Sequence, residues 1–135
     1  MTRVLFACVH NAGRSQMAAA WFNALADPEK ARGISAGTQP GTRVHPEVLT
    51  VMGEVGIDLS LATPTFLSDD LARTVQVLVT MGCGDACPFV PGLERVDWNL
   101  PDPKGQSLVV VRGIRDEVRG LVDGLVSGRG WRRPA

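Results

Sequence analysis

Apolar residues along the chain follow two patterns: short continuous runs and longer stretches with helical spacing. A continuous apolar run is typical of a strand buried on both faces, whereas apolar residues three and four positions apart are typical of an amphipathic helix. Together with the turn residues between them, these patterns predict strands at residues 2–7, 31–35, 75–81 and 95–98. They predict helices at residues 15–26, 46–55, 69–73 and 107–126.

The alternation of predicted strands and helices indicates an α/β fold with a parallel sheet that is covered on both faces. The 135 residues are enough for one domain, which we predict over residues 1–128, followed by a loose C-terminal tail at residues 129–135. Ligands of such folds bind at the carboxyl ends of the strands. Because Cys8, Cys83 and Asp102 each follow a predicted strand, we expect them to meet at that edge of the sheet.

Charge and composition narrow the range of partners. The formal net charge is zero and charged residues make up 21% of the chain, which favours neither nucleic-acid binding nor disorder. The N-terminal apolar run is too short for a signal peptide, and no stretch is long enough to span a membrane. With three cysteines and no secretory signal, the sequence predicts a cytoplasmic protein with reduced thiols and no membrane partner.

Residues 8–15 predict an anion-binding loop. The first apolar run leads into Cys8, Gly13 permits a tight loop, and a helix begins near Ser15. The amide groups and dipole of a helix start attract an anion, and together with Arg14 they favour the thiolate form of Cys8. Arg14 can also donate two parallel hydrogen bonds to a tetrahedral oxyanion. We interpret the loop as a nucleophilic thiolate facing a phosphate-like anion; the alternative is a buried cysteine that serves as a small apolar residue.

Two polar residues inside this loop are interpreted structurally. Asn11 tolerates the left-handed backbone that a cupped loop needs. His10 could add positive charge near the thiolate, but we interpret it as an exposed loop residue without a catalytic role.

Cys83 and Cys87 lie four positions apart in a loop that also contains Gly82 and Gly84. Disulfide exchange requires the attacking sulfur to approach in line, and a flexible loop permits that approach. Three thiols near one edge of the sheet therefore suggest redox chemistry. The alternatives are two unreactive loop thiols or a zinc site, for which only two histidines remain as further ligands.

Asp102 stands before Pro103 in a predicted loop. A carboxylic acid at this place could protonate a leaving oxygen as the nucleophile displaces it. The alternative is a turn, since many Asp-Pro pairs only form turns.

Six segments of the chain occur in order at spacings that match a known family. They are CVHNAGRSQMA, SAGT, GIDLS, TMGCGDACP, DWNLPDPKG and IRDEVRGLV. Over about residues 3–126 the chain resembles arsenate reductases of the low-molecular-weight protein tyrosine phosphatase fold. The resemblance implies a flavodoxin-like three-layer sandwich with a four-stranded parallel sheet and a phosphate-type loop at residues 8–14.

The resemblance also implies the first half of a mechanism. Cys8 would attack arsenate, for which phosphate or sulfate are mimics, while Ser15 stabilises the thiolate and Asp102 protonates the departing oxygen. The residues implied to bind the oxyanion are Val9, His10, Asn11, Ala12, Gly13 and Arg14.

The second half of the implied mechanism is a disulfide relay without a bound cofactor. Cys83 would attack the Cys8–arsenic adduct, which releases arsenite and leaves a Cys8–Cys83 disulfide. Cys87 would then attack Cys83, and thioredoxin would reduce the resulting Cys83–Cys87 pair. Related enzymes instead use a small thiol such as mycothiol with a glutaredoxin-like partner and need only Cys8; the presence of all three cysteines favours the relay.

One departure concerns a potassium ion that related thioredoxin-coupled enzymes bind near Asn11 and Ser35. The carboxylates expected with these two residues are replaced here by Ala19 and Thr65. The sequence therefore predicts no resident metal, and the replacements argue against potassium.

Two other functions remain open at this stage. A low-molecular-weight phosphotyrosine phosphatase would use the same Cys8, Arg14 and Asp102 through a phosphocysteine. Such phosphatases usually carry aromatic residues just after the Asp-Pro pair, whereas here Lys104 and Gly105 follow and the chain has no tyrosine. A non-catalytic oxyanion or redox sensor would keep the loop and the cysteines but would not need Asp102.

Overall fold

The computed structural model describes residues 1–82, 87–88 and 90–134. The predicted strands and helices are all present, with boundaries that differ by a few residues. In chain order they are β1 (Thr2–Cys8), α1 (Arg14–Leu25), β2 (Ala31–Gly37), α2 (Pro46–Glu54), α3 (Asp69–Ala72), β3 (Val77–Thr80), β4 (Glu94–Asp97) and α4 (Leu108–Gly128).

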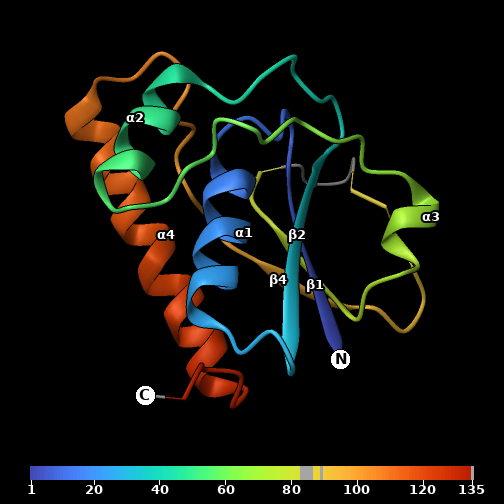
Figure 1. Cartoon of the computed structure of the whole chain (residues 1–135). Coiled ribbons are helices and arrows are strands. Elements are labelled where there is room, and N and C mark those ends of the chain that lie inside the picture. The colour runs from blue at the N-terminus through green and yellow to red at the C-terminus, as the bar shows by residue number, and fades with distance from the viewer. Residues whose placement is uncertain (83–86, 89, 135) are drawn as a thin grey trace.

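The four strands form one parallel sheet in the order β2-β1-β3-β4. Helices α1, α2 and α4 lie on one side of this sheet and α3 lies on the other (Figure 1). This arrangement confirms the predicted three-layer α/β fold. All four strands end at the same edge, so the loops after β1, β3 and β4 are brought together there.

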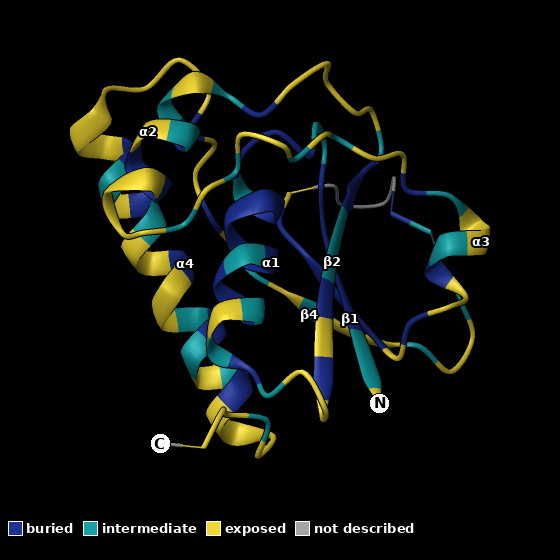
Figure 2. Cartoon of the chain, viewed as in Figure 1, coloured by how far each residue is buried: buried dark blue, intermediate teal, exposed yellow. Residues whose placement is uncertain are grey.

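The core consists of two clusters, one on each face of the sheet. Alternate residues of β1 point to opposite faces: Val4, Phe6 and Cys8 belong to the cluster beneath α1 and α4, whereas Leu5 and Ala7 belong to the cluster beneath α3. Burial follows the same division, because β1 is buried along most of its length and the helices are buried on one side (Figure 2). The continuous apolar run at residues 2–7 therefore reflects a central strand that is covered on both faces.

The face that α2 buries differs from the predicted one by one position. Val48, Leu49, Met52 and Val55 are the residues predicted to face the core, yet Val55 is 38% exposed and Val51 is fully buried. The helix ends at Glu54, so Val55 lies beyond its last turn and no longer follows the helical spacing.

Residues 131–133 are held by contacts with the end of α1, which corrects the prediction of a loose tail for this part of the chain. The Trp131 ring meets Phe22 of α1 edge-on at 5.9 Å. The Trp131 carbonyl accepts a hydrogen bond from the Asp27 amide at 2.6 Å, and the Arg133 amide donates to the Leu25 carbonyl at 3.0 Å. A large aromatic residue next to an uncovered edge of the core explains the difference. The division of the chain at residue 128 stays a prediction.

Within the described part of the chain, no helix is both long and apolar enough to cross a lipid bilayer.

Candidate active site

The loop between β1 and α1 is shaped by its neighbours in the sheet. Asn11 has a left-handed backbone, with φ of +50°, as predicted for a cupped loop. The carbonyls of Val9, His10 and Ala12 accept hydrogen bonds from the amides of residues 39, 41 and 45 at 2.8–2.9 Å. A Cβ atom on Gly37 would lie 2.6 Å from the Val9 carbonyl oxygen, so only glycine permits this close approach. The carbonyl groups of the loop therefore attach it to the segment that follows β2.

The amides of the loop are largely free to meet a ligand. The Asn11 amide donates to the Cys8 sulfur at 3.3 Å. In the described part of the chain, the amides of residues 10 and 12–14 donate no hydrogen bond to another backbone group. Free amides at the start of a helix form a site for an anion. This is the arrangement predicted for oxyanion binding.

Cys8 is the reactive centre of this loop. It is a free thiol and only 2% exposed. Its sulfur lies 2.8 Å from the hydroxyl oxygen of Ser15, which in turn accepts a hydrogen bond from Asn11 Nδ2 at 2.7 Å. Because Asn11 donates to Ser15, the Ser15 hydroxyl hydrogen is available to the sulfur. The sulfur thus has two neighbouring groups with which it can share hydrogen bonds, the Asn11 amide and the Ser15 hydroxyl.

The Asn11 side chain is fixed by further hydrogen bonds. Its Oδ1 accepts from the Thr65 amide at 2.9 Å and from Gln16 Nε2 at 3.2 Å. An amide oxygen has two lone pairs, and both are directed to these donors. This use of Oδ1 argues against Asn11 as a ligand of potassium.

Arg14 is placed by the two loops that follow β3 and β4. Its Nη1 donates to the Leu100 carbonyl at 3.1 Å, and its Nη2 lies 4.0 Å from Asp102 Oδ2. Gly82 passes close to it with φ of +99°, and a Cβ atom there would lie 2.7 Å from Nη1. The guanidinium is therefore aimed by backbone contacts, with its side chain 11% exposed.

Asp102 lies beside Arg14, as the order of the strands predicts. Its side chain is half exposed, and its Oδ1 accepts a hydrogen bond from the Lys104 amide at 3.0 Å. Pro103 is buried against the loop, where a Cβ atom on Gly13 would lie 2.6 Å from its ring. Asp102 is therefore part of a tight turn, which holds its carboxyl at the edge of the oxyanion loop; its role as a proton donor stays a prediction.

His45 is a histidine near this carboxyl that the sequence did not single out for the active site. Partial burial lowers its pKa, an effect that the nearby charge of Asp102 partly opposes. The imidazole is therefore neutral at pH 7. His10 is half-buried, and its Nδ1 lies 3.0 Å from the Gln39 carbonyl. This contact holds the ring against the segment that follows β2.

Cys87 is placed differently from Cys8. It is 5% exposed and disulfide-bonded, and it packs in the cluster on the α3 side of the sheet. This bond corrects the prediction that the thiols are reduced. Cys8 belongs to the cluster on the other side. Cys83, together with its predicted approach to Cys8, lies outside the described residues. In the part of the chain that is described, no group of histidine, cysteine or carboxylate side chains could hold a metal ion.

The structure adds three groups that the sequence did not indicate. Gln16 fixes Asn11, the Leu100 carbonyl fixes Arg14, and Gly82 leaves room for the guanidinium. Gly82 alone carries a signal that could have been recognised, because a glycine directly after a buried strand often marks a close approach. Leu100 lies 86 positions from Arg14, so this contact leaves no local pattern, whereas Gln16 lies only five positions from Asn11, in the first turn of α1.

Comparison with known proteins places this site in a family. Residues 3–129 match the model of the family described as low molecular weight phosphotyrosine protein phosphatase. The chain is 36% identical over 130 residues to the glutaredoxin arsenate reductase of Synechocystis sp., covering 94% of this chain and 98% of the relative. It is 35% identical over 119 residues to arsenate reductase 1 of Bacillus cereus, covering 85% of this chain and 87% of the relative.

A solved structure agrees with these matches. The thioredoxin-dependent arsenate reductase of Corynebacterium glutamicum superposes with a TM-score of 0.82 at 39% identity. The match covers 95% of this chain but 61% of that one, so the present chain spans less than two thirds of its length. With its parallel sheet and its Cys8–Arg14 loop, the chain therefore belongs to the low molecular weight phosphotyrosine protein phosphatase family, among the arsenate reductases of that fold.

Proposed function

We propose that this protein reduces arsenate to arsenite, with Cys8 as the nucleophile. The free amides of the loop and the Arg14 guanidinium bind the oxyanion, and the Cys8 thiolate attacks the arsenic atom. Asp102 gives its proton to the oxygen that leaves as water. A Cys8–arsenic adduct results, in which arsenic is still in the +5 state.

The observation that carries this proposal is the environment of the Cys8 sulfur. The sulfur accepts a hydrogen bond from the Asn11 amide at 3.3 Å and lies 2.8 Å from the Ser15 hydroxyl oxygen. Arg14 and Asp102 stand together at the edge of the same loop. A nucleophile, an oxyanion-binding group and a proton donor are thus available around one small anion.

For the second stage we infer the relay through Cys83 and Cys87. Attack of Cys83 on the Cys8 sulfur forms a Cys8–Cys83 disulfide, and the electron pair of the broken sulfur–arsenic bond stays on arsenic, which leaves as arsenite. Cys87 then displaces Cys8 to give a Cys83–Cys87 disulfide. Cys8 and Cys87 belong to clusters on opposite faces of the sheet. This separation supports a relay in which a third thiol carries the disulfide from one to the other.

Thioredoxin is the proposed reductant of that disulfide. The name of the thioredoxin-dependent relative from Corynebacterium glutamicum supports this choice, while the name of the Synechocystis relative includes glutaredoxin. Mycothiol with a glutaredoxin-like protein is the alternative, and it would need Cys8 alone. Either route takes place in the cytoplasm and uses no bound cofactor.

The decisive experiment is a steady-state arsenate assay with thioredoxin, thioredoxin reductase and NADPH. We expect Cys83→Ser and Cys87→Ser each to abolish turnover, because each removes one thiol of the relay. Single-turnover release of arsenite is expected to survive in Cys87→Ser but not in Cys83→Ser. Turnover that persists in both variants, or that requires mycothiol, would exclude the relay and leave the Cys8-only route.

The Asp102→Asn variant separates this enzyme from a non-catalytic oxyanion or redox sensor. We expect arsenate turnover to fall about 100-fold, a typical contribution of a positioned general acid, while phosphate binding is retained. Unchanged turnover would remove Asp102 from the mechanism. Hydrolysis of an aryl phosphate, measured in the same variants, tests a phosphotyrosine phosphatase that uses Cys8, Arg14 and Asp102 but neither distal cysteine.

A further inference from the structure

A cleft of about 440 Å³ adjoins the oxyanion loop on the side of α2. Its volume lies within the roughly 300–1,000 Å³ range of small-molecule sites. Three parts of the chain form it: the loop itself, the segment between β2 and α2, and the turn after Asp102. The lining residues are His10, Ala12, Gly41, Thr42, Arg43, His45, Pro46 and Lys104.

The charged residues that the structure describes in the lining of the cleft are positive. They are Arg43 and Lys104, both exposed, and none of the described carboxylates is part of this lining. In the described part of the chain, neither side chain has a carboxylate within ion-pair distance. This sets them apart from most arginines of the protein, such as Arg112 and Arg129, which are paired with glutamates.

Two carboxylates lie close to the cleft but outside its lining. Asp102 is directed to Arg14, and Glu47 lies in the first turn of α2 outside the lining. The two histidines in the cleft add hydrogen-bonding groups without fixed negative charge. The cleft therefore presents two cations without an ion-pair partner among the described residues, next to the proposed oxyanion loop.

We propose that this cleft binds a second anionic group of a ligand whose oxyanion occupies the loop, so that the protein takes small acidic phosphomonoesters in addition to bare oxyanions. The phosphate would lie on the loop amides and Arg14, and a carboxylate or second phosphate would lie between Arg43 and Lys104. This inference rests on the oxyanion loop of the proposed function, but not on arsenate reduction.

The lining also explains why an acidic ligand is favoured over an aryl phosphate. Among the residues that the structure describes, no phenylalanine or tryptophan lines the cleft, so these residues offer an aromatic leaving group no ring to stack on. A carboxylate, by contrast, would gain two charge-assisted contacts that water and salt weaken but do not abolish.

The test is calorimetric titration of the full chain with two ligands that differ in one group. Glycerol 3-phosphate and 3-phosphoglycerate carry the same phosphate, but only the second carries a carboxylate. We expect 3-phosphoglycerate to bind about fivefold to tenfold more tightly at low salt. This preference should shrink in 0.5 M NaCl, since exposed charges are screened over about 3–8 Å at such ionic strength.

The variants Arg43→Gln and Lys104→Gln, singly and together, assign the preference to the cleft. The double variant should bind both ligands equally and inorganic phosphate as the wild type does. Arg32→Gln is the matched control, because Arg32 is an exposed arginine of β2 that does not line the cleft, and it should leave the preference unchanged.

Three results would overturn the proposal. Equal binding of the two phosphate esters by the wild type would remove the second anion site, and a preference that survives the double variant would place it elsewhere. If inorganic phosphate itself does not bind, the oxyanion loop of the proposed function fails as well. Phosphate binding without a preference for the ester that carries a carboxylate would overturn only the proposed second anion site in the cleft.

Discussion

The Cys8 sulfur and the Ser15 hydroxyl belong to a chain of hydrogen bonds that continues to Asn11. Asn11 Nδ2 can only donate, so it fixes the Ser15 oxygen as an acceptor. The Ser15 hydroxyl hydrogen is then left for the Cys8 sulfur at 2.8 Å. Gln16 and the Thr65 amide in turn hold the Asn11 oxygen, so the side chain that contacts Ser15 is itself held by two further residues.

Gly82 controls the position of Arg14 in the same indirect way. A methyl group at residue 82 would lie 2.7 Å from Arg14 Nη1, too close for the guanidinium to stay where it is. We therefore expect Gly82→Ala to weaken phosphate binding about tenfold, as measured by calorimetry, because Arg14 would lose its bond to the Leu100 carbonyl or its aim at the oxyanion.

Gly92→Ala separates this contact from backbone strain. Gly92 has φ of +81°, similar in sign to the +99° of Gly82, but a Cβ atom there would meet nothing within 4 Å. Both variants should lose a comparable amount of stability, roughly 1–3 kcal/mol, whereas only Gly82→Ala should lose phosphate affinity. Equal affinities in the two variants would refute the contact.

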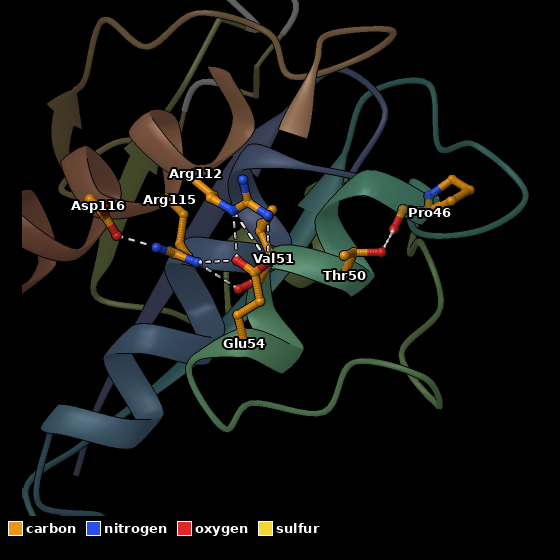
Figure 3. A network of polar contacts seen from close by, with 7 residues as sticks. All are labelled: Pro46, Thr50, Val51, Glu54, Arg112, Arg115 and Asp116. Atoms are coloured by element: carbon orange, nitrogen blue, oxygen red, sulfur yellow. Dashed lines mark hydrogen bonds and ion pairs between the residues drawn. The ribbon is translucent and has the colours of Figure 1, made fainter. Parts of the chain in front are cut away.

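At the scale of elements, α2 and α4 are joined by a group of ion pairs. Arg112 and Arg115 of α4 both reach Glu54 at the end of α2, with contacts of 2.7 and 3.0 Å, as Figure 3 shows. Arg115 also donates to the Val51 carbonyl at 2.9 Å. This group holds the end of α2 against α4, and α2 begins at the cleft beside the oxyanion loop.

Glu54 makes the stability of this junction depend on pH. Its pKa is lowered below the ordinary value of 4.5, chiefly by the hydrogen bond from Arg112. The folded state therefore binds this proton less tightly than the unfolded state. The stabilisation is present above pH 4.5 and is lost as the pH falls through the lowered pKa.

We expect Glu54→Gln to lower the melting temperature by a few degrees at pH 7, and the difference from the wild type to shrink towards pH 3. Circular dichroism melts over this range measure the effect. Asp70→Asn is the control, because the Asp70–Arg73 pair of α3 has side chains 97% and 62% exposed and should contribute little. A constant difference at all pH values would contradict the role given to Glu54.

At the scale of the whole molecule, the candidate site and the C-terminal contacts with the core lie at opposite ends of the sheet. Its carboxyl edge carries Cys8, Arg14 and Asp102, whereas the residues after α4 close the core at the opposite end, where the termini lie (Figure 1). Trp131 covers Phe22 there, and the Arg129 guanidinium lies 5.6 Å from the Trp131 ring. Substitutions at this end should therefore change the free energy of unfolding without changing the affinity of the site for phosphate.

We expect Trp131→Ala to reduce the free energy of unfolding by about 1–3 kcal/mol, less than for a fully buried tryptophan because the ring is only half-buried. Phosphate affinity should be unchanged. Urea denaturation and calorimetry measure the two quantities. Leu61→Ala is the control for an exposed apolar residue, since Leu61 is 94% exposed, and a loss equal to that of Trp131→Ala would contradict the packing role.

The sequence by itself determined the fold class, the elements and the position of the Cys8 loop. These features depend on local signals: apolar runs for strands, helical spacing for helices, and a cysteine, glycine and arginine within seven consecutive residues. The order of strands and helices then sufficed to place Asp102 at the same edge as Cys8, because parallel strands end together.

Only the tertiary structure decided how these residues are oriented and what surrounds them. Arg14 is fixed by Leu100, 86 positions away, and Asn11 by Thr65, 54 positions away. The packing of Trp131 on Phe22 and the basic cleft between Arg43 and Lys104 likewise join distant segments. Contacts of this kind depend on how the chain runs between the elements. The spacing of apolar residues within one element predicts that element, but not which distant residues it will meet.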